Sequence, residues 1–490
     1  TKMALQNNLE IAIQDTNEQI SQQKILQAFG AYDPKLTATF GMNQQKSANT
    51  NLATASTQGS FNKMDRANWN VGFSQPLKTG GTVEVNWNTS RSDNNQAFSL
   101  FTPQYNASAT VSFTQPLWRN LRIDSNRGQI KLVNLDLESS DSKFKQKVTE
   151  TIANIQSQYW DLVGAIRNYQ IKRDSVRFAQ ITLRDNRKKV EVGTLAPIEV
   201  TDAQANVAQR EVELLAAEEQ ILNQENALRN LISNDRKADI WNRVIVPTDA
   251  PDFKEYKVEL ETAIATALAN RPELEQIDIQ LKQSDINQEM TRNTRKWQFD
   301  LTAQFGSTGV AGPQTIRGGQ PTIPDSLVGG MGTAYKTVFT EGFTNWQVAF
   351  QVQIPLRNRS ADAQLAQQQI SQRQQMMQRK STEQSIQVEV RNAVQKLETS
   401  RKQVETAGVS RRFAKERLDG ETKRFEAGLS QNYLVLQRQN ELSSAEYTEL
   451  QALINYKKAI ITLQKAMYTL LESNEFEIAK GSSESIPNLK

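Results

Sequence analysis

The chain has 490 residues, of which 38% are hydrophobic, and no apolar run approaches the roughly eighteen residues of a membrane-spanning helix, so any membrane contact must come from strands. Its 58 basic and 54 acidic residues are spread along the whole chain with a net charge of +4, as on solvated helix faces, and nucleic acid is not an expected partner. Without histidine or cysteine the chain lacks the commonest general base and has no disulfides or thiolate metal sites, so we expect no cofactor and no metal.

Strands are predicted in the first half from about residue 35 to 117, because apolar and polar residues alternate there with a period of two. Each strand has one apolar face with aromatic ends, and its opposite face carries mostly Asn, Gln, Ser and Thr. Trp69, Trp87 and Phe113 fall on the apolar faces. Apolar faces outside and uncharged polar faces inside are typical of outer-membrane barrels.

One pair of these strands has no counterpart later in the chain. The span from Ala67 to Ser92 is predicted to be an additional β-hairpin, with a tight turn at Lys78-Thr79-Gly80-Gly81. Segments 47–66 and 93–104 are rich in small polar residues and are predicted to be long connections between strands.

The first half ends in a helical hairpin over about residues 124–233. Apolar residues from Val148 to Tyr169 repeat at alternating spacings of four and three, which indicates a heptad seam. The turn of this hairpin is predicted at Val192 to Pro197, where Gly193 closes one helix and Pro197 opens the next.

The second half repeats the same plan. Its strands carry Trp346 and Phe350 on their apolar faces, and its helical hairpin turns near Gly428. In chain order we expect a linker at 234–257, a helical lead-in at 258–270, strands over about 297–356 with a long connection at 310–342, a helical hairpin over about 361–472, and a polar tail at 473–490.

A constant offset of 235 residues aligns about sixty positions of the two helical hairpins, for example Gly193 with Gly428, which indicates an internal duplication. We therefore predict a mixed α and β fold with a duplicated helix-strand-helix plan. The first structural repeat covers 1–240 and the second covers 241–490. The start Thr1 to Leu5 shows no signal peptide, so we expect a mature or trimmed product.

Over essentially the whole chain, the sequence resembles the TolC-like outer-membrane efflux proteins. The resemblance is carried by the doubled plan, the strand entry Tyr32-Asp33-Pro34, the strand exit Gln115-Pro116-Leu117, and the approaches Arg187 to Gly193 and Arg424 to Gly428 to the two tips. It implies a homotrimer whose strands close one transmembrane β-barrel shared between protomers, and whose long coiled-coil hairpins form a periplasmic α-barrel. The chain would then lie in the bacterial outer membrane and extend into the periplasm.

The resemblance also implies a function. The protein would be the passive outer-membrane channel of a tripartite efflux or type I secretion system, joined through a periplasmic adaptor to an inner-membrane pump. Family members commonly supply four strands per chain, whereas six are predicted here, so twelve and eighteen barrel strands both remain open. The alternative function is a coiled-coil structural or adhesin-type surface protein, whose apolar strand faces would pack together in water.

Candidate functional residues lie at the tips and on the strands, and no cluster has the spacing of a nucleophile and its base, so no enzymatic activity is expected. Glu199 and Asp202 follow the first tip and either cap a helix or narrow the mouth of the tunnel. Trp69, Trp87, Phe113, Trp346 and Phe350 are expected to face lipid. The expected adaptor-docking tips are Gly193, Thr194 and Leu195 in the first repeat and Gly428, Leu429 and Ser430 in the second.

Overall fold

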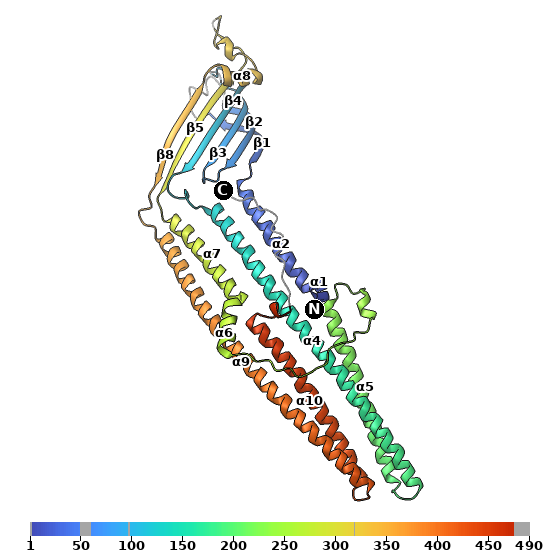
Figure 1. Cartoon of the computed structure of the whole chain (residues 1–490). Coiled ribbons are helices and arrows are strands. Elements are labelled where there is room, and N and C mark those ends of the chain that lie inside the picture. The colour runs from blue at the N-terminus through green and yellow to red at the C-terminus, as the bar shows by residue number, and fades with distance from the viewer. Residues whose placement is uncertain (1, 50–59, 97–98, 318, 475–490) are drawn as a thin grey trace. The chain divides into compact units, whose positions relative to one another are not determined.

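The computed structural model describes residues 2–49, 60–96, 99–317 and 319–474 (Figure 1). The chain divides into two compact units, and each unit draws on both halves of the sequence. The helical unit consists of Thr1–Ile20, Leu137–Gln280 and Gln375–Lys490, and the sheet unit consists of Ser21–Asp136 and Leu281–Gln374.

Two long helical hairpins occur at equivalent positions of the two repeats. The first pairs α4 (Ser125–Glu191) with α5 (Ile198–Ile232), and the second pairs α9 (Arg359–Glu426) with α10 (Asn432–Met467). Both predicted hairpins are present, and their bounds agree to within one residue when shifted by the offset that aligns the sequences. Within the described residues, no helix combines the length and apolarity that crossing a membrane requires.

The predicted heptad seam of α4 lies in the core of the helical unit. Val148, Ile152, Ile155 and Leu162 are all buried, and Ile152 and Leu162 are fully inaccessible to solvent. They belong to two neighbouring clusters, one with Ile461 of α10 and one with Leu228 of α5. The spacing of four and three therefore predicted the packing face of this helix.

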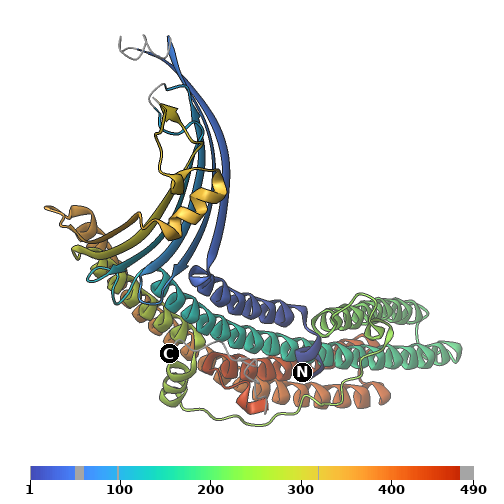
Figure 2. The same cartoon turned by 90° about the horizontal axis from the view of Figure 1, so that it is seen from above.

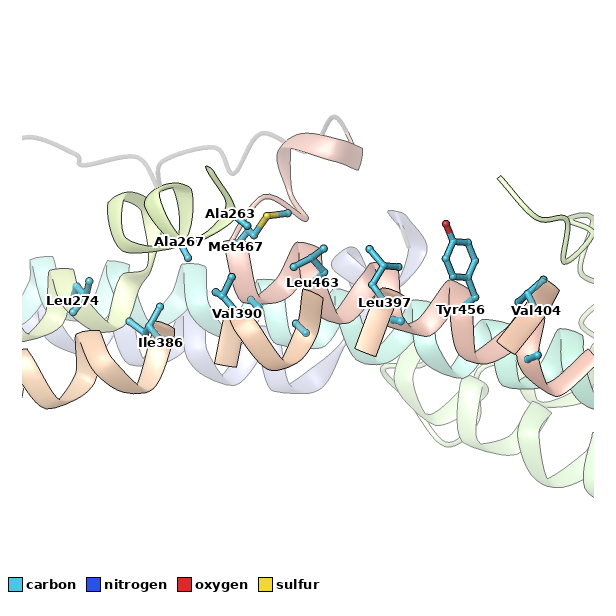
Figure 3. Packing of buried hydrophobic residues seen from close by; sticks show 14 of the residues in the cluster. Ala263, Ala267, Leu274, Ile386, Val390, Leu397, Val404, Tyr456, Leu463 and Met467 are labelled. Atoms are coloured by element: carbon cyan, nitrogen blue, oxygen red, sulfur yellow. The ribbon is translucent and has the colours of Figure 1, made fainter. Parts of the chain in front are cut away.

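The helical lead-in of the second repeat is α6 (Leu260–Asn270), which packs with Ala263 and Ala267 into the largest core cluster (Figure 3). Leu463 and Met467 of α10 belong to the same cluster. The preceding linker is held by Tyr456, a fully buried residue whose hydroxyl donates to the carbonyl of Lys254 at 3.0 Å. The same hydroxyl accepts the backbone N–H of Tyr256 at 2.9 Å.

Shorter helices lead into the first strand of each repeat. A short helix α1 (Lys2–Asn7) precedes α2 (Leu9–Phe29), and α2 ends six residues before the first strand, β1 (Lys35–Ala48), begins. The counterpart of α2 in the second repeat, α7 (Pro272–Thr294), ends four residues before β5 (Gln298–Ala311) begins. Both helices lie directly before a strand, which is the order that the duplicated plan predicts.

In the described part of the chain, six long strands form one sheet in the order β1-β2-β3-β4-β5-β8, and every neighbouring pair is antiparallel. The strands are β1 (Lys35–Ala48), β2 (Phe61–Pro76), β3 (Thr82–Asn94), β4 (Gln104–Pro116), β5 (Gln298–Ala311) and β8 (Thr344–Gln353). The six predicted strands are therefore confirmed. Strands β1 and β8 form the two edges of the sheet.

The additional hairpin of the first half is β2 and β3, which lie inside the sheet between β1 and β4. The prediction placed it at Ala67 to Ser92, but it extends from Phe61 to Asn94. The expected connections at 47–66 and 93–104 are correspondingly shorter, and residues 50–59 and 97–98 lie outside the described residues. Polar residues near the strand ends hid this extension, because they continue the ladder of backbone hydrogen bonds without apolar alternation.

The expected connection at 310–342 is not all loop, and the prediction was wrong for its second half. A helix, α8 (Met331–Thr340), packs against β4 and β5 (Figure 2). Ala334 and Val338, one turn apart, are buried there with Ala107 and Ala311. A side chain on Gly309 would collide with the helix backbone, so this glycine permits the close approach. The preceding stretch holds β6 (Ile316–Arg317), β7 (Gln320–Pro321) and a 3-10 turn at Asp325–Leu327.

Candidate functional site: two helical tips and an apolar sheet face

The first tip is a helix end closed by a left-handed glycine. Gly193 has a φ of +77°, and its N–H donates to the carbonyl of Val190 at 3.0 Å. The N–H of Thr194 donates to the carbonyl of Lys189 at 2.8 Å, and the Thr194 hydroxyl donates to the same oxygen at 3.0 Å. These bonds form a Schellman motif, which satisfies the last carbonyls of α4.

The second tip has the same geometry. Gly428 has a φ of +73° and donates to the carbonyl of Phe425 at 3.1 Å, while Leu429 donates to that of Arg424 at 2.8 Å. Open space surrounds the position of a Cβ at both glycines, so backbone conformation and not crowding is the reason for glycine at these positions. The prediction that glycine closes both helices is confirmed.

Apolar side chains are exposed around both turns. Leu429 is 80% exposed and Val192 is 72% exposed, and Ile198 and Tyr433 also lie open to solvent at the starts of α5 and α10. Leu195 is half-buried. Exposed apolar groups next to a rigid turn are a common feature of protein-binding surfaces.

Direct contacts connect the two tips of one chain. The ammonium of Lys189 lies 3.9 Å from the ring centre of Phe425. The side-chain amide of Asn432, which is buried, donates to the Glu199 carboxylate at 3.2 Å. Asp202 is exposed on the following turn. The carboxylate of Glu199 therefore joins the two hairpins, and nothing in the sequence pattern pointed to Asn432 as its partner.

A second link between the hairpins centres on Arg210 of α5, which is 4% exposed. Its guanidinium donates to Asn206 and to Asn440 of α10, each at 2.7 Å, and also to the hydroxyl of Ser175 of α4. Burial lowers the pKa of Arg210 below its ordinary value, an effect that the nearby Glu213 carboxylate partly offsets. Arg210 was not predicted to be functional, because the sequence pattern of a buried arginine on a helix is the same as that of an ordinary surface arginine.

The sheet unit presents one apolar face. Residues paired directly across antiparallel strands share a face, and the register places Val85, Val111, Phe305 and Trp346 in one row of that face. Phe113 lies in the row that ends at Val348, and Phe350 lies one row further along β8. Large side chains exposed on this face include Leu36, Phe40, Met42, Val71, Phe73, Val85, Val111, Phe305, Trp346, Val348 and Phe350.

The opposite face of the sheet is polar. Its side chains line a hollow of about 700 Å³, and most of them are uncharged amides and hydroxyls. The residues of this face around the hollow include Asn68, Asn70, Asn88, Ser90, Asn106 and Ser108. The two faces therefore differ in the way that a wall between lipid and water requires.

Helix α8 covers part of the apolar face near the strand connections. The ring of Trp87 stacks on Phe339 with a centroid distance of 6.0 Å and contacts Tyr335 at 5.6 Å. The indole N–H of Trp69 donates to the Tyr335 hydroxyl at 3.0 Å. Trp69 and Trp87 are thus half-buried against α8, whereas Trp346 and Phe350 are 76% and 61% exposed.

Comparison with known proteins identifies the class. The model of the family described as outer membrane efflux protein matches residues 82–234 and 263–467, which is more than half of the chain. The chain therefore belongs to the outer membrane efflux protein family. Its predicted family, its outer-membrane location and its role as an efflux channel are confirmed. No curated protein sequence matches the chain.

Solved structures show the same fold at low sequence identity. The Campylobacter jejuni CmeC outer membrane channel aligns with a TM-score of 0.65 and 17% identity, over 98% of this chain and 86% of that one. The Vibrio cholerae outer membrane protein VceC aligns with a TM-score of 0.66 and 14% identity, over 95% of this chain and 94% of that one. The open state of the Neisseria gonorrhoeae MtrE outer membrane channel aligns with a TM-score of 0.65 and 17% identity, over 96% of this chain and 88% of that one.

The tip geometry gives a matched pair of substitutions. Both Gly428 and Gly420 have open space for a Cβ, but only Gly428 has a left-handed φ. We expect Gly428→Ala to destabilise the turn by about 1–2 kcal/mol and Gly420→Ala, inside α9, to be neutral or stabilising. Hydrogen exchange of the Leu429 amide should accelerate by about 5- to 30-fold only in the first variant. Equal exchange in both variants would contradict the role assigned to this glycine.

Proposed function

We propose that three copies of this chain assemble into one outer-membrane channel whose wall is an eighteen-stranded barrel. The sheet is open, and its edges β1 and β8 would leave a row of backbone groups without partners in lipid. Six strands in antiparallel order make β8 antiparallel to β1, so β8 of one protomer pairs with β1 of the next. Membership in the efflux family supports the trimer.

The apolar face of the sheet is the observation that carries this proposal. In a barrel it faces lipid, and the amide-rich face lines a water-filled lumen. Phe299 and Gly309 of β5 lie in rows near the two ends of this face, and ten positions separate them along the strand. That span is about 34 Å along a strand, or about 26 Å along the barrel axis at the usual tilt, close to the apolar band of known barrels.

The alternative, a coiled-coil structural or adhesin-type surface protein, places the apolar face in water. Eleven large side chains exposed on one sheet face oppose that alternative, because soluble proteins rarely expose so extensive an apolar patch. Only α8 covers part of this face among the described residues, and it leaves Trp346 and Phe350 open.

The helical hairpins form the periplasmic tunnel of this channel, and their tips dock a periplasmic adaptor. The exposed apolar groups Val192, Ile198, Leu429 and Tyr433 would lie against the adaptor, with the Schellman turns holding them in place. The adaptor connects the channel to an inner-membrane pump of a tripartite efflux or type I secretion system. Because that pump supplies the energy, the channel itself is passive and performs no catalytic step.

Glu199 and Asp202 are proposed to narrow the tunnel mouth. Three copies place six carboxylates there, which favours cations over anions. The bond from Asn432 supports this role for Glu199, because the amide fixes the carboxylate between the two tips of each chain.

A charge on the lipid side of β8 tests the barrel. Val348 and Gln347 are neighbours on opposite faces of this strand, and both are exposed in the single chain. We expect Val348→Lys to destabilise the folded sheet by about 2–4 kcal/mol and Gln347→Lys, facing water, to have little effect. Urea unfolding in phospholipid vesicles, followed by tryptophan fluorescence, measures both variants. Equal midpoints for the two would show that this face does not meet lipid.

Single-channel recordings in planar bilayers test the channel and its constriction together. The wild-type protein should conduct and prefer cations, and the double variant Glu199→Gln with Asp202→Asn should bring the cation-to-anion permeability ratio toward one. The matched control, Glu218→Gln with Glu219→Gln, removes two exposed carboxylates further along α5. Absence of conductance would contradict the channel, whereas conductance with unchanged selectivity would remove only the proposed constriction.

A further inference from the structure

At the end of the apolar face that lies away from α8, the strands continue into helices. There β4 runs toward α4, and α7 runs into β5, so two chain segments lie side by side. The N–H of Leu117 donates to the carbonyl of Phe299 at 2.7 Å and fixes these segments against each other. They surround an open pocket of about 620 Å³, lined by Leu117, Trp118, Arg295, Lys296, Trp297 and Phe299.

Two tryptophans form the walls of this pocket. Trp118 is 59% exposed and Trp297 is 58% exposed, although indole rings are usually well covered in a folded chain. An indole left open in this way is stabilised at the border between lipid and water, where its ring meets apolar groups and its N–H stays hydrated. The pocket therefore fits a ligand that has both an apolar and a polar part.

The polar rim of the pocket is cationic. The ammonium of Lys296 lies 5.7 Å from the ring centre of Trp118, and no carboxylate of the described residues lies within ion-pair distance of it. Arg295 pairs through its Nε with Asp362 at 2.8 Å, and its half-exposed side chain keeps further donors for a ligand. A lysine without an acidic partner, beside a second cation, attracts an anion.

The turn that presents Trp118 is rigid. Asn120 has a left-handed φ of 64°, and its side-chain oxygen accepts the amide of Asn293 at 2.8 Å. Asn293 is 3% exposed and also donates to the carbonyl of Ile123 at 2.8 Å. Arg127 donates to the carbonyl of Asn120 at 2.5 Å. The backbone that carries Trp118 is thus held in place before any ligand arrives, which lowers the entropic cost of binding.

The pocket is continuous with the apolar face of the sheet. Phe299 belongs to that face, and its ring lies 6.3 Å from that of Phe350, one of the most exposed residues of the face. A chain-like apolar ligand in the pocket can therefore continue along the surface that the proposed barrel turns toward lipid.

We propose that this pocket binds one anionic glycerophospholipid per chain from the leaflet that borders the helices. Its phosphate contacts Lys296 and Arg295, and its glycerol and upper acyl chain lie between Trp118 and Trp297. The inference rests on the proposed barrel, because only a lipid-facing apolar face brings the pocket to the membrane border.

Native mass spectrometry of the detergent-purified trimer tests the lipid directly. Phosphatidylglycerol should bind more tightly than phosphatidylethanolamine with the same acyl chains, with up to three molecules per trimer. Lys296→Gln should weaken phosphatidylglycerol binding about fivefold, the effect of one cation at a lipid surface. The matched control is Lys336→Gln on α8, which removes an exposed lysine far along the sheet from this pocket. Inorganic phosphate at the same concentration should not displace the lipid, because it cannot occupy the indole walls.

Three results would overturn the inference: equal binding of the two lipids, unchanged binding by Lys296→Gln, or an equal loss in Lys336→Gln. Displacement by inorganic phosphate would also overturn it, because the site would then recognise an ion alone. Channel recordings on the same preparations separate this inference from the proposed function. Conductance without lipid preference rejects only the lipid site, whereas a protein that forms neither trimers nor channels rejects the proposed function.

Discussion

The unpaired hydrogen-bonding edges of β1 and β8 are the constraint on which the rest of this protein depends. In a lipid environment no water is present to satisfy backbone N–H and C=O groups, so an open sheet cannot persist there. Closure through neighbouring chains, as proposed here, would satisfy both edges, and six alternating strands give them the required antiparallel directions. The additional hairpin β2 and β3 leaves that alternation unchanged, because it adds two strands at once.

The two faces of the sheet and the two kinds of aromatic cluster follow from the same constraint. Bulky apolar residues occupy the central rows of one face, and small residues such as Ala107 and Gly309 replace them where α8 packs. At the other end, Trp118 and Trp297 remain open. The apolar face thus has an aromatic cluster at each end, one covered by a helix and one exposed as a pocket.

Periodicity in the sequence predicted the helices and strands whose packing pattern repeats along the chain. It did not predict an element whose formation depends on a single tertiary contact. The heptad spacing of Val148 and Ile152 and the alternation around Trp346 located helices and strands, and the tip glycines located both turns. Helix α8 was missed because so short a helix is stabilised mainly by packing, here on Ala311 and on Ala107, which lies far away in the sequence.

The candidate site was predicted to a similar degree. Adaptor docking at the tips and a constriction at Glu199 and Asp202 stay predictions, but both tip turns were predicted from the local signals of helix ends. The partners Asn432 and Arg210 were not, because buried polar residues on long helices have the same sequence pattern as exposed ones until the second hairpin is in place. The lipid pocket likewise depends on Asn293, which fixes the turn of a strand exit more than 170 residues away.

Disulfide cross-linking between the edge strands tests the central claim most directly, because the chain has no cysteine of its own. Ala38→Cys on β1 would be combined in turn with Trp346→Cys, Val348→Cys or Phe350→Cys on β8, all on the apolar face. Closure between protomers predicts covalent trimers after oxidation in outer membranes for at least one pair, and none for any of the single variants. Only uncrosslinked chains, or a link formed within one chain, would contradict the shared barrel.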